Sequence, residues 1–467
     1  MNIKFCGAAR QVTGSAHLIT LDDGFKILLD CGLYQGNDDE MDDFNSTWLF
    51  DPKEINCVVL SHAHIDHSGR LPKLIKDGYK GPIYSTHATR SLCAIMLLDS
   101  AFIQERDAAY WNKKRGNKNK YREPLYDKDD VKETMNRFIS YGYGKTFEVY
   151  PGVQVTYRDA GHILGSASVH MSIRDKNGDV IKVGFTGDIG RPNRPILRDP
   201  QIMDPVDYLI CESTYGDKEH ESGPREIERL LDIIHRTCVE KKGKLIIPAF
   251  SVGRTQEIVY IMDQLEHAGR LPRIPVYVDS PLAVNATTIF GAHPECYDAE
   301  LSSYLLKDPN PFGFNNLTYI KEVNASKRLN HSKNPCIIIS ASGMANAGRV
   351  KHHIFNNIEN PRNTILIVGY CAPNTPGGKL RDGVDEIGMF GVKKKVKAEV
   401  DVMDSFSAHG DRSEMYDFIR NQQKTVKKIF LVHGEIERQE SFREYLGERG
   451  FHGVVEIPEL GEAVRLY

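Results

Sequence analysis

Residues 61–67 read Ser-His-Ala-His-Ile-Asp-His, and this stretch decides how the rest of the chain is interpreted. It follows the apolar run 55–60 (INCVVL), whose β-branched residues predict a buried strand. Three imidazoles and one carboxylate so close together are the ligands that zinc and related metals bind. A histidine-rich surface loop is the alternative, but chance rarely assembles this cluster in a chain with 17 histidines among 467 residues. The stretch therefore predicts a transition-metal site at the end of a strand.

Short apolar runs alternate with helical patterns along most of the chain. The runs are rich in β-branched residues and bounded by Gly, Pro, Asn or Asp, as buried strands are. Helices are predicted at 225–240 and 254–268, where apolar residues recur every three or four positions. The region 225–370 thus reads βαβαβ, which predicts an α/β fold with a parallel doubly wound sheet. The predicted strands are 25–29, 55–60, 181–187, 206–211, 244–250, 274–279, 336–340, 363–369 and 427–432.

Further carboxylates and imidazoles each come just after a strand-like segment. Open α/β sheets bind ligands at this edge, so residues far apart in sequence can converge there. Taken singly, an Asp or His after a strand is more often a turn or cap residue. Together with residues 61–67, however, these residues predict one shared site. They are Asp30, His162, Asp188, Glu212, His409 and His433.

The same residues lie in motifs that resemble those of one family. The chain is similar to the β-CASP nucleases of the metallo-β-lactamase superfamily, which include the catalytic subunit of the cleavage and polyadenylation specificity factor and its bacterial and archaeal relatives. The likeness covers essentially the whole chain. Cys371 stands where relatives often carry Gln, which leaves every motif residue unchanged. The matching stretches are Asp30, 62–67 (HAHIDH), 161–167 (GHILGSA), 186–188 (TGD), 211–214 (CEST), 407–411 (SAHGD), 432–435 (VHGE), 248–257 (PAFSVGRTQE), 278–283 (VDSPLA) and 341–349 (ASGMANAGR).

The resemblance implies two zinc ions per chain. One ion would be bound by His62, His64 and His162, and the other by Asp66, His67 and His433. Asp188 would bridge both ions, and Asp30 would hold a ligand histidine in the correct tautomer. Glu212 and His409 are not needed as ligands, and we expect them to pair beside the scissile phosphate. The predicted catalytic residues are Asp66, Asp188, Glu212 and His409.

Two loops of the predicted parallel sheet are candidates for binding RNA phosphates. Residues 341–349 follow a predicted strand but lack the Lys-Ser/Thr pair of a Walker A loop. Backbone N–H groups at a helix start could bind a phosphate there, and a tight turn that requires glycine is the alternative. The candidate residues are Ser251, Arg254, Ser342, Gly343 and Arg349.

Two basic stretches have two interpretations each. Residues 111–122 (WNKKRGNKNKYR) and the lysines at 393–395 and 397 are either solvated surface or contacts to a phosphate backbone. The sequence leaves this choice open.

The composition is that of a globular protein with two or three domains, since 40% of residues are hydrophobic and 26% charged. The formal charge of -3 argues against bulk electrostatic capture of nucleic acid, so a polyanion needs a local site. No apolar run approaches the roughly 20 residues of a membrane span. The nine cysteines include no CxxC pair, and no leader is recognisable, so we expect a cytoplasmic protein with reduced thiols.

We therefore predict an αββα metallo-β-lactamase domain formed by residues 1–208 and 396–467, with an inserted β-CASP domain over 209–395. The predicted activity is zinc-dependent hydrolysis of phosphodiester bonds in single-stranded RNA, during RNA processing or decay. Internal cleavage and cleavage from the 5′ end are both open, as are the RNA target, the protein partners and a homodimeric state.

Three alternatives have different sequence requirements. A thioesterase of the same superfamily lacks the long insertion and the motif around His409. A non-catalytic partner subunit is disfavoured because all seven ligand positions are present. A single-stranded DNA nuclease is the nearest alternative, but in this family a histidine at the position of His433 accompanies the RNA-processing branches.

Overall fold

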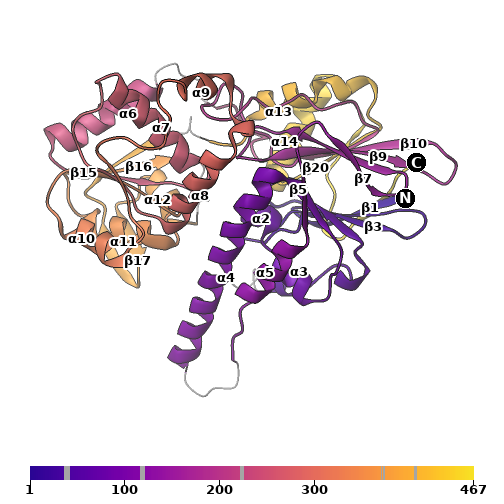
Figure 1. Ribbon diagram of the computed structural model, residues 1–467, viewed down its shortest axis with the longest axis horizontal. Helices are drawn as coiled ribbons and strands as arrows, with labels where there is room; N and C mark the ends of the chain where they lie inside the picture. The colour runs from indigo at the N-terminus through magenta and orange to yellow at the C-terminus, as the bar shows by residue number, and fades with distance from the viewer. Residues whose placement is uncertain (36–42, 116–120, 221–225, 370, 372–373, 404–406) are drawn as a thin grey trace. The chain divides into compact units, whose positions relative to one another are not determined.

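The structure is a computed structural model that describes residues 1–35, 43–115, 121–220, 226–369, 371, 374–403 and 407–467. Contacts divide the chain into two compact units (Figure 1). Unit 1 comprises Met1–Glu219 and His409–Tyr467, and unit 2 comprises His220–Ala408. Unit 2 is thus inserted into the chain of unit 1.

Unit 1 contains two seven-stranded sheets. The first has the strand order β22-β1-β2-β3-β4-β5-β6, and its strands β3 to β6 pair in parallel. Its strands are β1 (Asn2–Gly7), β2 (Ala16–Thr20), β3 (Lys26–Leu29), β4 (Cys57–Val59), β5 (Ile83–Thr86), β6 (Phe138–Tyr141) and β22 (Ala463–Arg465).

The second sheet has the order β21-β20-β11-β10-β9-β8-β7. Strands β10, β11, β20 and β21 pair in parallel, whereas β7 to β10 form an antiparallel meander. Its strands are β7 (Thr146–Tyr150), β8 (Val153–Asp159), β9 (Ala167–Arg174), β10 (Val180–Phe185), β11 (Tyr208–Glu212), β20 (Lys428–Val432) and β21 (Val455–Glu456).

The two sheets of unit 1 pack face to face, and helices cover their outer faces. Phe5 and Val59 from the first sheet share one buried cluster with Phe185 and Phe430 from the second. Helices α13 and α14 pack on the outer face of the second sheet through a separate cluster. The arrangement is the predicted αββα sandwich. The helices are α2 (Ile65–Ser68), α3 (Leu71–Lys76), α4 (His87–Arg115), α5 (Lys128–Asn136), α13 (Arg412–Ile419) and α14 (Ile436–Glu448).

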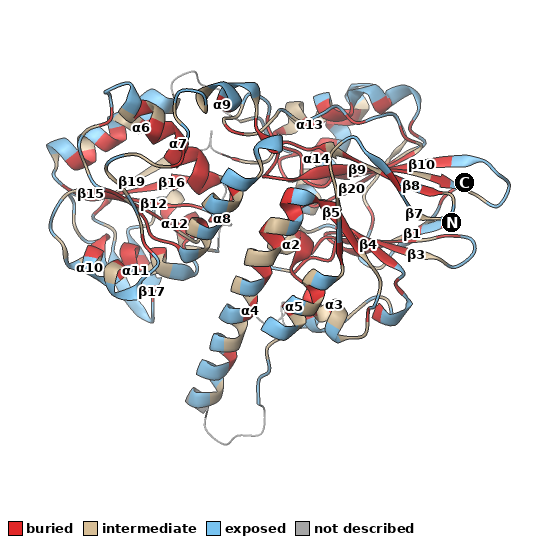
Figure 2. Cartoon of the chain, viewed as in Figure 1, coloured by how far each residue is buried: buried red, intermediate tan, exposed pale blue. Residues whose placement is uncertain are grey.

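Unit 2 is built on a six-stranded sheet of order β14-β13-β15-β12-β16-β19, in which every pair is parallel. This confirms the predicted parallel sheet, in which β12, β15 and β16 are wholly buried, whereas the edge strands β14 and β19 are mostly half-buried (Figure 2). The six strands are β12 (Lys244–Pro248), β13 (Val276–Val278), β14 (Leu317–Tyr319), β15 (Cys336–Ser340), β16 (Thr364–Val368) and β19 (Glu399–Met403). A separate two-stranded hairpin consists of β17 (Glu386–Met389) and β18 (Val392–Lys395). The helices are α6 (Glu226–Ile234), α7 (Arg254–His267), α8 (Pro281–Ala292), α9 (Ala299–Tyr304), α10 (Val323–His331), α11 (Gly348–Asn357) and α12 (Pro376–Arg381).

Two details differ from the simplest expectation. The helix predicted over 225–240 is α-helical only to Ile234, and a π-helical turn occupies His235–Glu240. The two boundaries between the units lie after Glu219 and after Ala408, slightly later in the chain than the expected limits 209 and 395 of the inserted domain. The reason is that β11 pairs within the sheet of unit 1, and β19 pairs with β16 of unit 2. In the part of the chain that is described, no helix is long and apolar enough to cross a membrane.

Candidate metal centre

The histidine-rich stretch leaves β4 and turns directly into a short helix. His64 immediately precedes helix α2, and Asp66 and His67 lie within this helix. The His64 carbonyl accepts the N–H groups of His67 and Ser68, so the chain reverses within a few residues. This turn brings the imidazoles and the carboxylate to one side, at the end of a buried strand.

Two other residues reach the site by adopting left-handed backbone conformations. Asp30 has φ +58° just after β3, and His433 has φ +54° just after β20. Non-glycine residues rarely occupy this region, and such strain is concentrated at functional sites. The backbone at these two positions is therefore bent to aim a polar side chain.

Four side chains of unit 1 form a first cluster of ligand atoms. His64 Nδ1 lies 3.1 Å from His62 Nε2 and 3.2 Å from His162 Nε2. Asp188 Oδ2 lies 3.4 Å from both His62 Nε2 and His162 Nε2. All four atoms could contact one ion placed between them.

A second cluster lies on the other oxygen of the same aspartate. His67 Nε2 lies 3.1 Å from Asp188 Oδ1 and 3.1 Å from His433 Nε2. Asp66 Oδ2 lies 3.4 Å from His433 Nε2. Asp188 thus has one carboxylate oxygen in each cluster, as expected for a residue that bridges two ions.

The two clusters fit metal ions. Ligand atoms about 2.0–2.1 Å from a shared tetrahedral zinc ion lie about 3.3 Å apart, close to the separations found here. Asp188 Oδ1 is buried and accepts no hydrogen bond from any described residue, although imidazole nitrogens surround it. A buried carboxylate oxygen without a donor is costly, and a cation at this place would compensate for it.

Hydrogen bonds set the tautomers of three ligand histidines. The Asp30 carboxylate accepts a 2.6 Å bond from His67 Nδ1. The Ser61 hydroxyl donates to Asp30 and so accepts from His62 Nδ1, at 3.0 Å. The Thr214 hydroxyl donates to the His433 carbonyl and so accepts from His433 Nδ1, at 2.9 Å. In each case the proton lies on Nδ1, which leaves the Nε2 lone pair facing the cluster.

Sequence analysis predicted the orienting role of Asp30 but missed Ser61 and Thr214. Both are in quoted motifs, at the start of SHAHIDH and the end of CEST. Their proximity to the ligand residues was the available signal, but a lone hydroxyl carries no indication of its partner.

Burial keeps the imidazoles of the first cluster neutral. It lowers the pKa of His64 to about 3, with His62 adding to the effect, and holds the pKa of His162 well below its usual range. The pKa of His67 shifts in the opposite direction. Burial lowers it, but the carboxylates of Asp188 and Asp30 outweigh burial and raise the pKa above its usual range. Neutral imidazole is the form that binds metal, so the first cluster needs no deprotonation near neutral pH.

Glu212 and His409 lie beside the two clusters as a pair. His409 Nδ1 is 3.3 Å from Glu212 Oε2, and His409 Nε2 is 3.9 Å from Asp188 Oδ2. Glu212 is buried at the end of β11, and its other oxygen accepts the Ile189 N–H. Burial lowers the pKa of His409, but Glu212 and Asp188 outweigh it and raise the pKa to about 9. The His409 side chain remains one-fifth exposed, so a substrate can reach it.

The candidate phosphate-binding residues lie on two neighbouring loops of unit 2 and in the first turns of the helices α7 and α11 that follow them. The loops follow β12 and β15, which are paired strands, and the Phe250 ring packs against Gly343. Ser251 Oγ lies 3.2 Å from Ser280 Oγ, and Ser342 Oγ donates to Asn346. Arg254 forms an ion pair with Glu257, and Arg349 donates to buried Asp279 at 2.6 Å. The loops meet as the parallel sheet requires, while both guanidinium groups contact carboxylates of their own unit.

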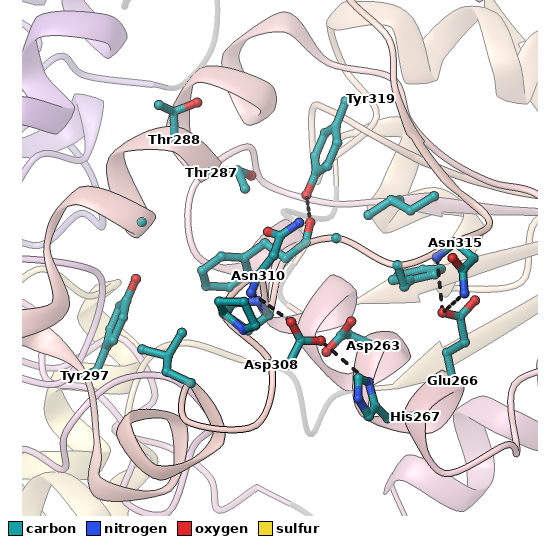
Figure 3. Close-up of a pocket in the computed structure, with 18 of the residues that line it drawn as sticks. Asp263, Glu266, His267, Thr287, Thr288, Tyr297, Asp308, Asn310, Asn315 and Tyr319 are labelled. Carbon is teal, nitrogen blue, oxygen red and sulfur yellow. Dashed lines mark hydrogen bonds and ion pairs between the residues drawn. The ribbon is translucent and has the colours of Figure 1, made fainter.

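Among its described residues, unit 2 contains one further cluster of possible metal ligands, which the sequence motifs do not indicate. Asp263, His267 and Asp308 line a cavity of about 980 Å³, one helical turn separating the first two on α7 (Figure 3). The Tyr304 hydroxyl donates to Asp263 at 2.7 Å, and burial raises the pKa of that carboxyl to about 6. The i, i+4 spacing was the available sequence signal. None of the predicted catalytic residues lines this cavity.

Comparisons with known proteins match the chain in three segments. Residues 18–182 match the metallo-beta-lactamase superfamily domain, 255–380 the Beta-Casp domain, and 393–457 the Zn-dependent metallo-hydrolase RNA specificity domain. A solved structure of a protein of unknown function from Enterococcus faecalis V583 aligns over 100% of this chain and 99% of its own, with a TM-score of 0.55 and 13% identity. That likeness shows the fold.

Two named relatives match nearly the full length of this chain. Ribonuclease TTHA0252 from Thermus thermophilus is 33% identical over 99% of this chain and 100% of its own. Transcription termination factor FttA from Methanosarcina mazei is 32% identical over 93% of this chain and 67% of its own. With its ligand-rich motifs gathered at one end of an αββα sandwich, the chain belongs to the β-CASP family of metallo-β-lactamase-fold ribonucleases, which are metal-dependent hydrolases that act on RNA.

Proposed function

We propose that the protein hydrolyses phosphodiester bonds of single-stranded RNA with two zinc ions bound by the clusters that meet at Asp188. The observation that carries the proposal is the division of this carboxylate: Oδ2 lies 3.4 Å from two imidazole nitrogens of the first cluster, and Oδ1 lies 3.1 and 3.6 Å from two of the second. Support comes from TTHA0252, which is named a ribonuclease. The residues that would hold the ions are His62, His64, His162, Asp66, His67, His433 and Asp188.

The ions, when bound, supply Lewis acidity and a water of lowered pKa for attack on phosphorus. The protein prepares the site by holding the ligands in place. Asp30, Ser61 and Thr214 hold protons on Nδ1 atoms, so that the opposite nitrogens face inwards. Because five of the seven ligands are buried and the other two half-buried, this arrangement loses little energy to solvent reorganisation when substrate binds.

The Glu212–His409 pair would assist the leaving group. A departing ribose oxygen needs a proton or charge stabilisation, whereas the metal ligands are already committed. Glu212 orients the His409 imidazole, and the Gly410 N–H donates to the Ile189 carbonyl at 2.7 Å, which fixes the loop beside Asp188. His409 would contact the scissile phosphate or protonate the leaving oxygen, a step typically worth about 10² to 10⁴ in rate.

RNA is the proposed polymer rather than DNA, because His433 occupies the position that accompanies RNA processing in this family. Unit 1, residues 1–219 with 409–467, would be the metallo-β-lactamase domain, and unit 2, residues 220–408, would be the β-CASP domain. The loops with Ser251 and Ser342 would offer hydroxyl and N–H groups to phosphates, since Arg254 and Arg349 are paired internally.

The proposal is tested by metal analysis and hydrolysis measurements. Purified protein should contain close to two zinc ions per chain, and EDTA should abolish cleavage of single-stranded RNA. Asp188→Ala should lose both ions, whereas Asp66→Ala, which touches only the second cluster, should retain one. RNA should be cleaved much faster than DNA of the same sequence. Full activity in EDTA, or equal rates on both polymers, would contradict the proposal.

A further inference from the structure

The long helix α4 carries exposed aromatic and basic side chains in its second half. Phe102 and Tyr110 are 61% and 59% exposed, and Arg106 lies between them at the same spacing of four residues. Residues at i and i+4 lie on one helix face, and Lys113 continues this face by one more turn. The face therefore alternates aromatic rings with cations, and we call these four residues the α4 stripe.

The chain that returns from the helix end packs on a different face. Asn112 and Arg122 exchange two hydrogen bonds of 2.9 Å through the Arg122 backbone. Nearer the body of unit 1, Leu125 N–H donates to Gln104, and the Tyr126 hydroxyl donates to Ser100. Ser100 and Gln104 lie on the far side of the helix from the α4 stripe and Asn112 lies to one side of it, so these hydrogen bonds of the returning chain fall outside the stripe.

The helix begins beside the loop that carries His162 and extends away from this loop. The hydroxyl groups of Thr86 and Thr89 both donate hydrogen bonds to the Gly165 carbonyl, at 2.6 and 2.8 Å. Gly165 belongs to the loop that carries His162. At about 1.5 Å per residue, the stripe from Phe102 to Lys113 lies roughly 20 to 36 Å along the helix from Thr89. Figure 1 shows α4 extending beyond α3 and α5 of the same unit.

Charge indicates which kind of partner this end of the helix fits. Residues 111–122 (WNKKRGNKNKYR) contain six Lys and Arg and no Asp or Glu, in a chain whose net charge is -3. The surface ion pair of Arg106 with Asp107, at 3.9 Å, is exposed on both sides and weak. Tyr121, 80% exposed, adds an aromatic ring beside the basic residues. Exposed rings interleaved with cations are what single-stranded nucleic acid binds, through base stacking and phosphate contacts.

We propose that the α4 stripe, with Tyr121 and Arg122, binds the single-stranded part of the RNA substrate about six to ten nucleotides from the scissile bond. The inference rests on the proposed ribonuclease function and adds a binding site to it. The number of nucleotides follows from the 20 to 36 Å reach, divided by the stacked spacing of about 3.4 Å per nucleotide. Bases would stack on Phe102, Tyr110 and Tyr121, while Arg106, Lys113 and Arg122 would contact phosphates.

The test compares substrates that can and cannot reach the α4 stripe. We expect Tyr110→Ala/Tyr121→Ala to raise KM for an unstructured 20-nucleotide RNA about tenfold, which corresponds to about 1.4 kcal/mol. Cleavage of a tetranucleotide is the internal reference, because it is too short to span the distance. Lys113→Gln/Arg122→Gln should lower the slope of log Kd against log salt by about 1.4, or about 0.7 for each lost phosphate contact. A purely structural role would not change that slope.

Binding is measured separately from cleavage with a 20-nucleotide 2′-O-methyl phosphorothioate strand, which resists hydrolysis. The matched control is Lys176→Gln/Val180→Ala, which alters an exposed cation between β9 and β10 and the exposed apolar residue that begins β10. Wild-type Kd in both stripe variants would overturn the inference. So would a change from dimer to monomer with unchanged Kd, which would assign the stripe to a second copy of the chain. If wild type cleaves no RNA, the ribonuclease proposal fails, and the Kd values still decide the role of the stripe.

Discussion

His409 is the residue whose role differs most from that of its neighbours. It lies close to Asp188, yet its Nδ1 faces Glu212 rather than either ligand cluster. Its loop is held by the Gly410 N–H, which donates to the Ile189 carbonyl. At the residue scale, the site therefore separates metal binding from assistance to the leaving group.

We expect His409→Ala to retain both metal ions and to lose about 10² to 10⁴ in rate on RNA. The same variant should keep most of its rate on an aryl phosphodiester, because nitrophenolate leaves without a proton. Glu212→Gln should show a smaller loss, and the double variant should resemble His409→Ala, since the two side chains act as a unit. Equal losses on both substrates, with metal content intact, would show that the acid role is wrong.

A second prediction at the residue scale concerns how Asp263 affects stability as the pH changes. Its pKa is raised by burial to about 6 from 3.8, so its contribution to stability is fully present below pH 3.8 and is lost as pH rises through about 6. Asp263→Asn keeps an acceptor for the Tyr304 hydroxyl and cannot ionise. Thermal unfolding should show the variant more stable than wild type by about 1 to 2 kcal/mol at pH 8, and no more stable at pH 4. Exposed Asp382→Asn is the control, and an equal gain for both variants would refute this account.

At the scale of elements, the loop between β8 and β9 must reach the start of α4 at close range. Gly165 has φ +82°, and a Cβ added there would lie 2.5 Å from the Thr89 backbone nitrogen. The same loop places His162, so its position depends on contact with a helix far away in sequence. A glycine is required for both the conformation and the approach.

Gly165→Ala should therefore destabilise unit 1 and weaken metal binding by the first cluster. The matched control is Gly178→Ala, where φ is +92° but nothing lies within 4 Å of an added Cβ. The control should lose only the conformational part, about 1 kcal/mol. Gly165→Ala should lose about 1 to 3 kcal/mol more and bind zinc more weakly, as measured by thermal unfolding and competition with a chelator. Equal effects of the two substitutions would show that the contact with α4 is unimportant.

At the scale of the whole molecule, all seven proposed ligands belong to one of the two units. Metal ions bound only by the folded form stabilise it by RT ln(1 + [L]/Kd), about 4.1 kcal/mol at 1,000 times Kd. The sheet of unit 2 contributes no residue to either cluster. Loss of metal should therefore affect the units unequally.

Hydrogen exchange with and without EDTA measures this difference. We expect chelation to lower protection at β4 and β20, which precede ligand residues, and to leave β12 and β15 of unit 2 largely unchanged. Readdition of zinc should restore the protection, which controls for irreversible unfolding. A uniform loss of protection over both units would indicate that their stabilities are coupled.

The sequence by itself determined the nine strands with continuous apolar runs, the parallel sheet of unit 2 and the convergence of the motif residues, because hydrophobic period and strand-end position are local properties. It also indicated Asp30, since an aspartate after a strand lies at the ligand-binding edge. Only the tertiary structure decided which oxygen of Asp188 faces which imidazoles, and that Ser61 and Thr214 set tautomers. It likewise decided that Arg254 and Arg349 are paired internally, and that the hydrogen bonds of Arg122, Leu125 and Tyr126 to α4 fall outside the α4 stripe. These features depend on differences of a few tenths of an ångström in the distances between segments that are far apart in sequence. Residue type and spacing do not specify such differences.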